Sequence, residues 1–129
     1  MSGRQITLPQ AAAASAELAI QLTGLAARTD LPTLFCVRFY DWFNDYPGAT
    51  AILDTPSDSG DDENGAIIGA IEAWATALGT EISYAAPEAR PLQPGVLRQR
   101  VSATRKYDSG ARFTVYDHIY LPLDGPAQV

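Results

Sequence analysis

Residues 96–121 read VLRQRVSATRKYDSGARFTVYDHIYL, and this stretch decides the fold. Two runs of strand-forming residues, 96–107 and 111–121, flank Asp108, Ser109 and Gly110. A three-residue loop that ends in glycine is typical of a β-hairpin, because its last position requires a left-handed backbone. The sequence therefore predicts a long antiparallel hairpin in this part of the chain.

The turn also predicts which side chains share a face. If Tyr107 pairs with Ala111, side chains alternate between two faces along both strands, because the side-chain period of a strand is two. One face is apolar and should lie against the core; it carries Val101, Ala103, Phe113, Val115 and Ile119. The other face pairs Arg98, Arg100, Ser102, Thr104 and Lys106 with Tyr120, His118, Tyr116, Thr114 and Arg112 respectively.

Two amphipathic helices are expected before the hairpin. In the Ala-rich stretch 10–28 the spacing of Leu18, Leu22 and Leu25 predicts a core-facing stripe, which Ile20 widens. The second stripe repeats at intervals of four, three and four residues; its members are Ile67, Ile71, Trp74 and Leu78. Asn64 is expected to cap this second helix, and Gly79 is expected to stop it.

Residues 33–43, TLFCVRFYDWF, are rich in aromatic and β-branched side chains and predict a strand. Alternation places Phe35, Val37 and Phe39 on one side, and the other side carries Leu34, Cys36, Tyr40 and Trp42. Both sides are largely apolar, so we expect a central strand that is covered on each face. Shorter strands are expected at residues 49–53 and 81–84.

These elements give the order α-β-β-α-β-β-β. We expect one α+β domain over residues 1–129, because a chain of this length fits one hydrophobic core. The predicted architecture is a two-layer sandwich, with two helices on one face of an antiparallel sheet. This arrangement is the simplest one that buries both helical stripes.

Composition narrows the class of protein. Hydrophobic residues make up 47% of the chain, yet no apolar run approaches the roughly 20 residues that cross a bilayer. No secretory leader is evident, and the single cysteine, Cys36, excludes an internal disulfide. We therefore expect a cytoplasmic protein that does not bind membranes.

The formal net charge of -6 argues against general binding to nucleic-acid backbones, so nucleic acid is the least favoured partner. The charge is unevenly distributed along the chain. Residues 41–63 hold seven acidic residues and no Lys or Arg, whereas residues 96–129 hold five of the nine basic residues.

Signatures of catalysis are missing from the sequence. It has no Gly-rich nucleotide loop, no G-x-S-x-G elbow and no zinc constellation, and the acidic stretch 54–63 does not match an EF-hand. Asp117 and His118 are adjacent on a strand and should point to opposite faces, and Cys36 should behave as a small hydrophobe. We predict no catalytic residue, no metal and no cofactor, although cation binding by the acidic stretch stays open.

The outer sheet face, on the side away from the helices, is the candidate binding surface. Its predicted members are Tyr40, Trp42, Arg98, Arg100, Tyr116, His118 and Tyr120. The doubly apolar strand 33–43 needs a cover, which favours a non-enzymatic protein that binds a second copy, as a homodimer, or another protein.

Two alternatives use the same residues. One is a small-molecule binder or enzyme with a pocket between helices and sheet, lined by Tyr40, Trp42, Arg100, Tyr116 and His118. The other is a nucleic-acid regulator that uses the basic hairpin, with contacts from Arg98 and Arg100.

Residues 73–80 (AWATALGT), followed by a short strand and then residues 101–105 (VSATR) leading into a hairpin, form a recurring pattern. In this pattern the chain resembles small uncharacterised proteins that are common in actinobacteria. The resemblance implies a cytoplasmic accessory protein. It implies no catalytic or binding residue.

Overall fold

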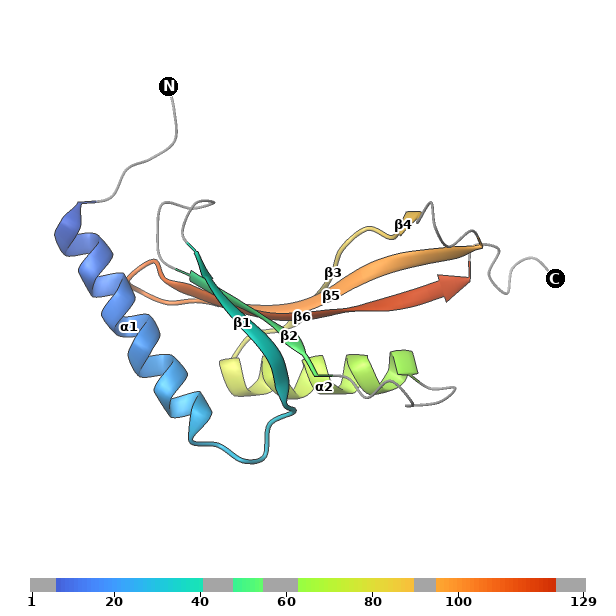
Figure 1. Cartoon of the computed structure of the whole chain (residues 1–129), viewed down its shortest axis with the longest axis horizontal. Coiled ribbons are helices and arrows are strands. Elements are labelled where there is room, and N and C mark those ends of the chain that lie inside the picture. The colour runs from blue at the N-terminus through green and yellow to red at the C-terminus, as the bar shows by residue number, and fades with distance from the viewer. Residues whose placement is uncertain (1–6, 41–47, 55–62, 90–94, 123–129) are drawn as a thin grey trace, which may run out of the picture.

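A computed structural model describes residues 7–40, 48–54, 63–89 and 95–122. These residues form the helices α1 (Leu8–Ala26) and α2 (Glu63–Leu78) and the strands β1 (Leu34–Tyr40), β2 (Gly48–Leu53), β3 (Ile82–Tyr84), β4 (Glu88–Ala89), β5 (Val96–Lys106) and β6 (Arg112–Pro122). Figure 1 shows α2 beneath β5 and β6, and α1 beside the end of the sheet where the β5–β6 turn lies. The predicted α+β class and the order of its elements are confirmed, with the short β4 as an addition.

The hairpin has the predicted register. β5 and β6 pair residue by residue from Val96 opposite Pro122 to Lys106 opposite Arg112. The backbone N–H of Tyr107 donates to the Ala111 carbonyl at 2.8 Å. Gly110 closes the turn at φ 98°, the left-handed conformation that the sequence required. The division of the hairpin into an apolar and a polar face is therefore confirmed.

The sheet is mixed where an antiparallel one was expected. Its strand order is β1-β2-β6-β5-β3, and β4 also pairs with β5. β2 runs parallel to β6, and the other pairs are antiparallel. The chain leaves β2 through α2 and reaches β6 as the second strand of the hairpin, so the two neighbours run in the same direction. Parallel strands need such a long connection, commonly with a helix in it.

β1 lies at an edge of the sheet, so the prediction of a central, doubly covered strand is wrong. Its residues Val37 and Phe39 pair with the buried Ala51 and Ala49 of β2 and therefore lie on the core side of the sheet. They are nevertheless exposed, because α2 packs on β6 and β5, which lie two and three strands away from β1. The apolar pattern of β1 correctly predicted a strand, but it wrongly predicted a cover on each face.

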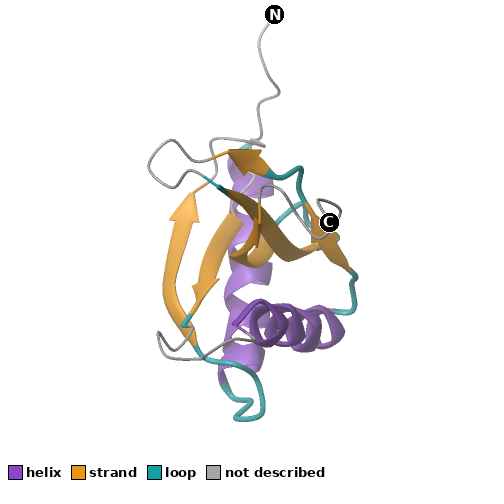
Figure 2. Cartoon of the chain, turned by 90° about the vertical axis from the view of Figure 1, so that its right-hand side faces the viewer, coloured by secondary structure: helices purple, strands orange, loops and turns teal. Residues whose placement is uncertain are grey.

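α2 provides the centre of the core. As predicted, its stripe is buried; the members are Ile67, Ile71, Trp74 and Leu78. The ring of Trp74 meets Phe113 of β6 edge to face, with 6.2 Å between ring centroids. The indole Nε1 of Trp74 donates to the Pro32 carbonyl at 3.0 Å, so its one polar atom is paired. Figure 2 shows this helix lying across the sheet, in a different direction from α1.

α1 begins at a capping box that was not predicted from the sequence. The Thr7 hydroxyl accepts from the Gln10 backbone, and the Gln10 side chain accepts from the Thr7 backbone. Leu18 is buried as predicted, whereas Ile20 is 68% exposed, so the stripe is narrower than expected. Glu17 accepts a hydrogen bond from the Ser109 backbone at 3.0 Å, and hydrogen bonding with Ser109 lowers the pKa of this carboxyl. This bond ties α1 to the hairpin turn.

Asn64 does not cap α2, because the helix already begins at Glu63. Its side-chain amide instead pairs with the backbone of Tyr120: Nδ2 donates to the carbonyl at 2.7 Å and Oδ1 accepts from the N–H at 3.1 Å. The last β2–β6 pair is Ile52 with Tyr116, so β6 extends beyond its neighbour there. The Asn64 amide therefore pairs with the backbone of Tyr120 in the way that a neighbouring strand would.

We expect Asn64→Ala to lower the free energy of unfolding by about 1–2 kcal/mol, since it removes two hydrogen bonds at a site open to water. Urea unfolding followed by circular dichroism measures the change. Glu72→Ala, an exposed change on the same helix, is the control and should stay within about 0.5 kcal/mol. Equal effects of the two changes would contradict the role assigned to Asn64.

Candidate functional site

Cations and aromatic rings gather on the face of the sheet opposite the buried side chains. Arg98, Arg100 and Lys106 alternate along β5 with the buried Val101 and Ala103. Arg112 of β6 lies on the same face. Arg38 of β1 lies there too, because it pairs with Thr50 of β2, and Thr50 in turn pairs with Thr114 of β6. We define the basic sheet face as Arg38, Arg98, Arg100, Lys106, Arg112, Tyr116, His118 and Tyr120. Figure 1 shows no described helix over this side of β5 and β6.

The charge of this face is opposite to that of the whole chain. It holds five of the nine Lys and Arg residues, while the chain carries a net charge of -6. Within the described strands the register places one carboxylate on it, Glu88, opposite Arg98. Five cations against one carboxylate give a formal charge of +4, so the remainder of the protein is strongly acidic. Such segregation creates a local positive potential that the average charge conceals.

The aromatic members contact the cations directly. The Arg100 guanidinium carbon lies 4.1 Å from the centroid of the Tyr116 ring, a cation–π contact across the strands. Tyr116 and His118 meet edge to face, with ring centroids 5.7 Å apart. Tyr120, opposite Arg98, is 39% exposed. The face therefore offers both charge and flat rings to a ligand.

Hydroxyl groups lie between the cations of β1 and β5. The Thr104 and Thr114 hydroxyls are hydrogen-bonded at 2.8 Å, and the register continues this row through Thr50 to Arg38. At one side of the row the Nε atom of Arg112 is buried and has no hydrogen-bond partner among the described residues. A buried N–H without an acceptor is unfavourable, and because this atom is closed to solvent the Nε does not itself offer a contact to a ligand on the face.

The structure brings together five of the seven side chains predicted for the outer face: Arg98, Arg100, Tyr116, His118 and Tyr120. Tyr40 ends β1 opposite Gly48, at a register position on the same face. Trp42 lies outside the described residues. Arg38 was missed, although it alternates with Cys36 and Tyr40 and could have been found from that spacing.

The residues considered for catalysis remain separate. Asp117 pairs with Val101 and His118 with Arg100, so they belong to opposite faces as expected. The Asp117 carboxylate accepts from the backbone N–H of His118 at 2.7 Å. Cys36 is a half-buried free thiol opposite Ile52. None of these contacts pairs a nucleophile with a general base.

Among the described residues, no three His, Cys, Asp or Glu side chains group as metal ligands, and residues 55–62 of the acidic stretch lie outside this part of the chain. Neither described helix is both long and apolar enough to span a bilayer.

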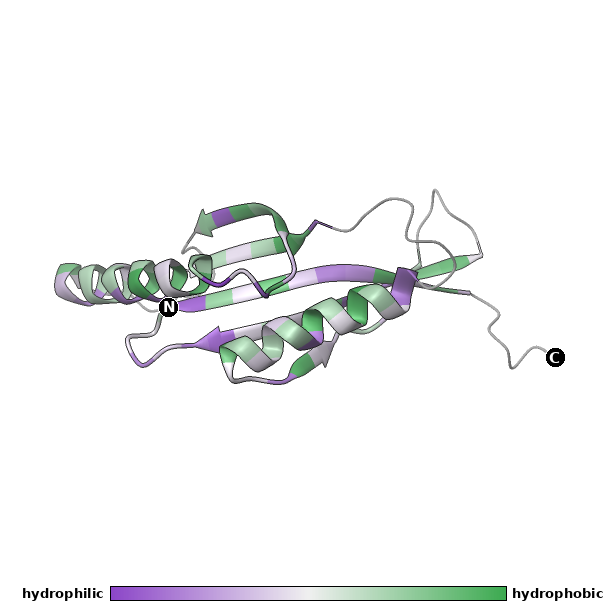
Figure 3. Cartoon of the chain, turned by 90° about the horizontal axis from the view of Figure 1, so that it is seen from below, coloured by the Kyte–Doolittle hydropathy of each residue, from purple (hydrophilic) through white to green (hydrophobic). Residues whose placement is uncertain are grey.

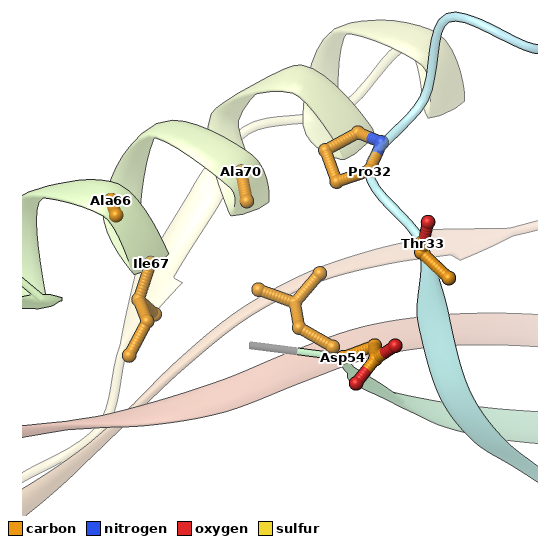
Figure 4. Close-up of a pocket in the computed structure, with 7 residues that line it drawn as sticks. Pro32, Thr33, Asp54, Ala66, Ile67 and Ala70 are labelled. Atoms are coloured by element: carbon orange, nitrogen blue, oxygen red, sulfur yellow. The ribbon is translucent and has the colours of Figure 1, made fainter. Parts of the chain in front are cut away.

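A small apolar pocket of about 130 Å³ lies where α2 passes the start of β1 and the end of β2 (Figure 4). It is lined by Pro32, Thr33, Leu53, Asp54, Ala66, Ile67 and Ala70. Ligand pockets are usually about 300–1,000 Å³. None of the residues predicted to line a small-molecule site contributes to this pocket, so it does not support that alternative.

No family model, curated protein or solved structure matches the chain.

Proposed function

We propose that this is a non-enzymatic binding protein that holds a single-stranded nucleic acid across the basic sheet face. The observation that carries the proposal is the concentration of five cations and three aromatic rings on one open face of the sheet. Phosphates are bound by cations, and unpaired bases stack on rings, so a surface with both is suited to single strands.

The arrangement of the cations fits an extended ligand. Along β5 they occur from Arg98 to Lys106, over roughly 27 Å of strand. Tyr116, His118 and Tyr120 alternate on the neighbouring β6, directly beside them. The cations of β5 and the rings of β6 therefore form two parallel rows. Phosphates would contact the first row and bases the second.

The acidic remainder of the protein is compatible with this function. A net charge of -6 disfavours contact with nucleic acid over most of the surface, and it therefore restricts binding to the basic sheet face. The sequence favoured a second copy or another protein on the outer face, because the apolar strand 33–43 was expected to need a cover and because the net charge of the whole chain argued against nucleic acid. An acidic protein surface is the competing partner on this face.

Arg100→Ala is expected to weaken binding of an oligonucleotide of about 16 nucleotides by roughly 1 kcal/mol, or about fivefold. Fluorescence anisotropy between about 50 and 200 mM salt measures the affinity and its salt slope, which should fall by about 0.7 when one phosphate contact is lost. Arg28→Ala is the matched control, because it removes the same charge from the exposed Arg28–Asp30 ion pair, away from the sheet.

Two outcomes would count against the proposal. The wild-type protein could fail to bind the oligonucleotide at low salt. Alternatively, Arg28→Ala could weaken binding as much as Arg100→Ala does, in which case net charge rather than the basic sheet face would govern the affinity.

A further inference from the structure

β1 presents an open edge with an apolar ridge. One of its edges pairs with β2, and no described strand pairs with the other. Phe35, Val37 and Phe39 are 74%, 42% and 66% exposed. Figure 3 shows this strand, mostly in the hydrophobic colour, at the border of the sheet. An exposed apolar edge strand is a ready template for a further strand.

The sequence of β1 is symmetric about Val37. Apolar side chains occur two residues before it, at it, and two residues after it, with Cys36 and Arg38 between them. A two-fold axis through Val37 pairs this residue with its own copy and pairs Phe35 with Phe39 of the second copy. Shifting the register by two residues in either direction leaves one phenylalanine without an apolar partner. The symmetric register is therefore the most favourable one.

We propose that β1 pairs antiparallel with β1 of a second copy, about a two-fold axis through Val37 and perpendicular to the sheet. On the opposite face Arg38 then lies across from Cys36 of the second copy, so no two guanidinium groups are directly opposed. The two basic sheet faces point the same way and join, with one Arg38 from each copy at the seam. The dimer thereby doubles the area of the cationic surface by widening the sheet across its strands.

Two features of β1 that discourage edge pairing leave this register open. The strand has a bulge between Leu34 and Cys36, and it carries a cation at Arg38. The bulge takes in Phe35, the residue between Leu34 and Cys36, so the two Phe35–Phe39 pairs involve an irregular end of the strand, whereas the Val37 pair at the axis lies in its regular part. Arg38 belongs to the face opposite the apolar ridge.

The exposed area supports a dimer of modest affinity. A phenylalanine side chain buries about 150–250 Å², so the exposed parts of Phe35 and Phe39 in two copies could remove at most roughly 400–700 Å² from water. This upper bound is about a third of the roughly 1,200–2,000 Å² in a stable interface, and Val37 and the paired backbones add to it. We therefore expect a dissociation constant in the micromolar range.

Disulfide cross-linking tests the register. Val37→Cys in a Cys36→Ser background should form an intermolecular disulfide quickly, because residues directly opposite in antiparallel strands have Cα atoms about 4.5–5.5 Å apart. Phe39→Cys in the same background is the matched control. In the proposed register the two copies of residue 39 are roughly 13 Å apart along the strands, too far for a disulfide.

Light scattering of the wild-type chain over a range of concentrations tests dimerisation without any substitution, and Val37→Lys should shift it to monomer. Equal cross-linking rates at positions 37 and 39, no cross-linking at either, or a wild-type monomer up to about millimolar concentration would overturn the proposal. All of these measurements are made without nucleic acid. Their failure is therefore distinct from a failure of the proposed function.

Discussion

Phe113→Ala is expected to lower the free energy of unfolding by about 3–5 kcal/mol, the cost of emptying a large buried site. Phe113 is 1% exposed and packs edge to face on Trp74. The loss is a large part of the roughly 5–15 kcal/mol that stabilises a domain of this size. Urea unfolding followed by circular dichroism measures it.

The same substitution at an exposed phenylalanine is the matched control. Phe39→Ala, at a dilution where the chain is monomeric, should change the free energy of unfolding by about 0.5 kcal/mol or less, because Phe39 is on the exposed ridge of β1. Phe113→Leu should recover much of the loss, with a cost of about 1–2 kcal/mol. An equal cost at positions 113 and 39 would contradict the assignment of core and edge.

The hairpin and α2 could be predicted because their signals are local. Turn chemistry at Gly110 and alternation on either side decide the β5–β6 register without reference to the rest of the chain. The stripe of Ile67, Ile71 and Trp74 likewise predicts a buried helical face from spacing alone.

The place of β1 in the sheet could not be predicted in this way. The alternation of Phe35, Val37 and Phe39 predicts an apolar face. Whether a helix covers that face depends on the position of the strand in the sheet. That position follows from the parallel pairing of β2 with β6, a contact between segments about 64 residues apart in sequence. The role of Asn64 depends on the same long-range geometry, since its partner is the Tyr120 backbone.

Only part of the candidate site could be predicted, because its residues come together partly through a local register and partly through long-range strand pairing. The hairpin supplied Arg98, Arg100, Tyr116, His118 and Tyr120 through one local register. Arg38 joins them only through the chain of pairings from β1 to β2 to β6. Net charge, averaged over 129 residues, conceals a face with a formal charge opposite in sign to that of the whole.

Tyr120→Ala is expected to weaken binding of a single-stranded oligonucleotide by about 1–3 kcal/mol, or roughly 5- to 150-fold, through loss of a stacking platform for a base. The same variant should bind inorganic polyphosphate, which has no bases, as well as the wild type does. Tyr120→Phe keeps the ring and should retain binding to both ligands. Competition anisotropy with the two polymers measures these affinities.

This comparison separates recognition of nucleic acid from attraction to any polyanion. The pairing of Asn64 with residue 120 uses its backbone, so removal of the ring leaves these hydrogen bonds in place. If the affinities for the oligonucleotide and the polyphosphate fell equally, Tyr120 would act by positioning the cations rather than by stacking on a base. If Tyr120→Ala left the affinity for the oligonucleotide unchanged, the surface would bind by charge alone, because a ring that stacks on a base must contribute to its affinity.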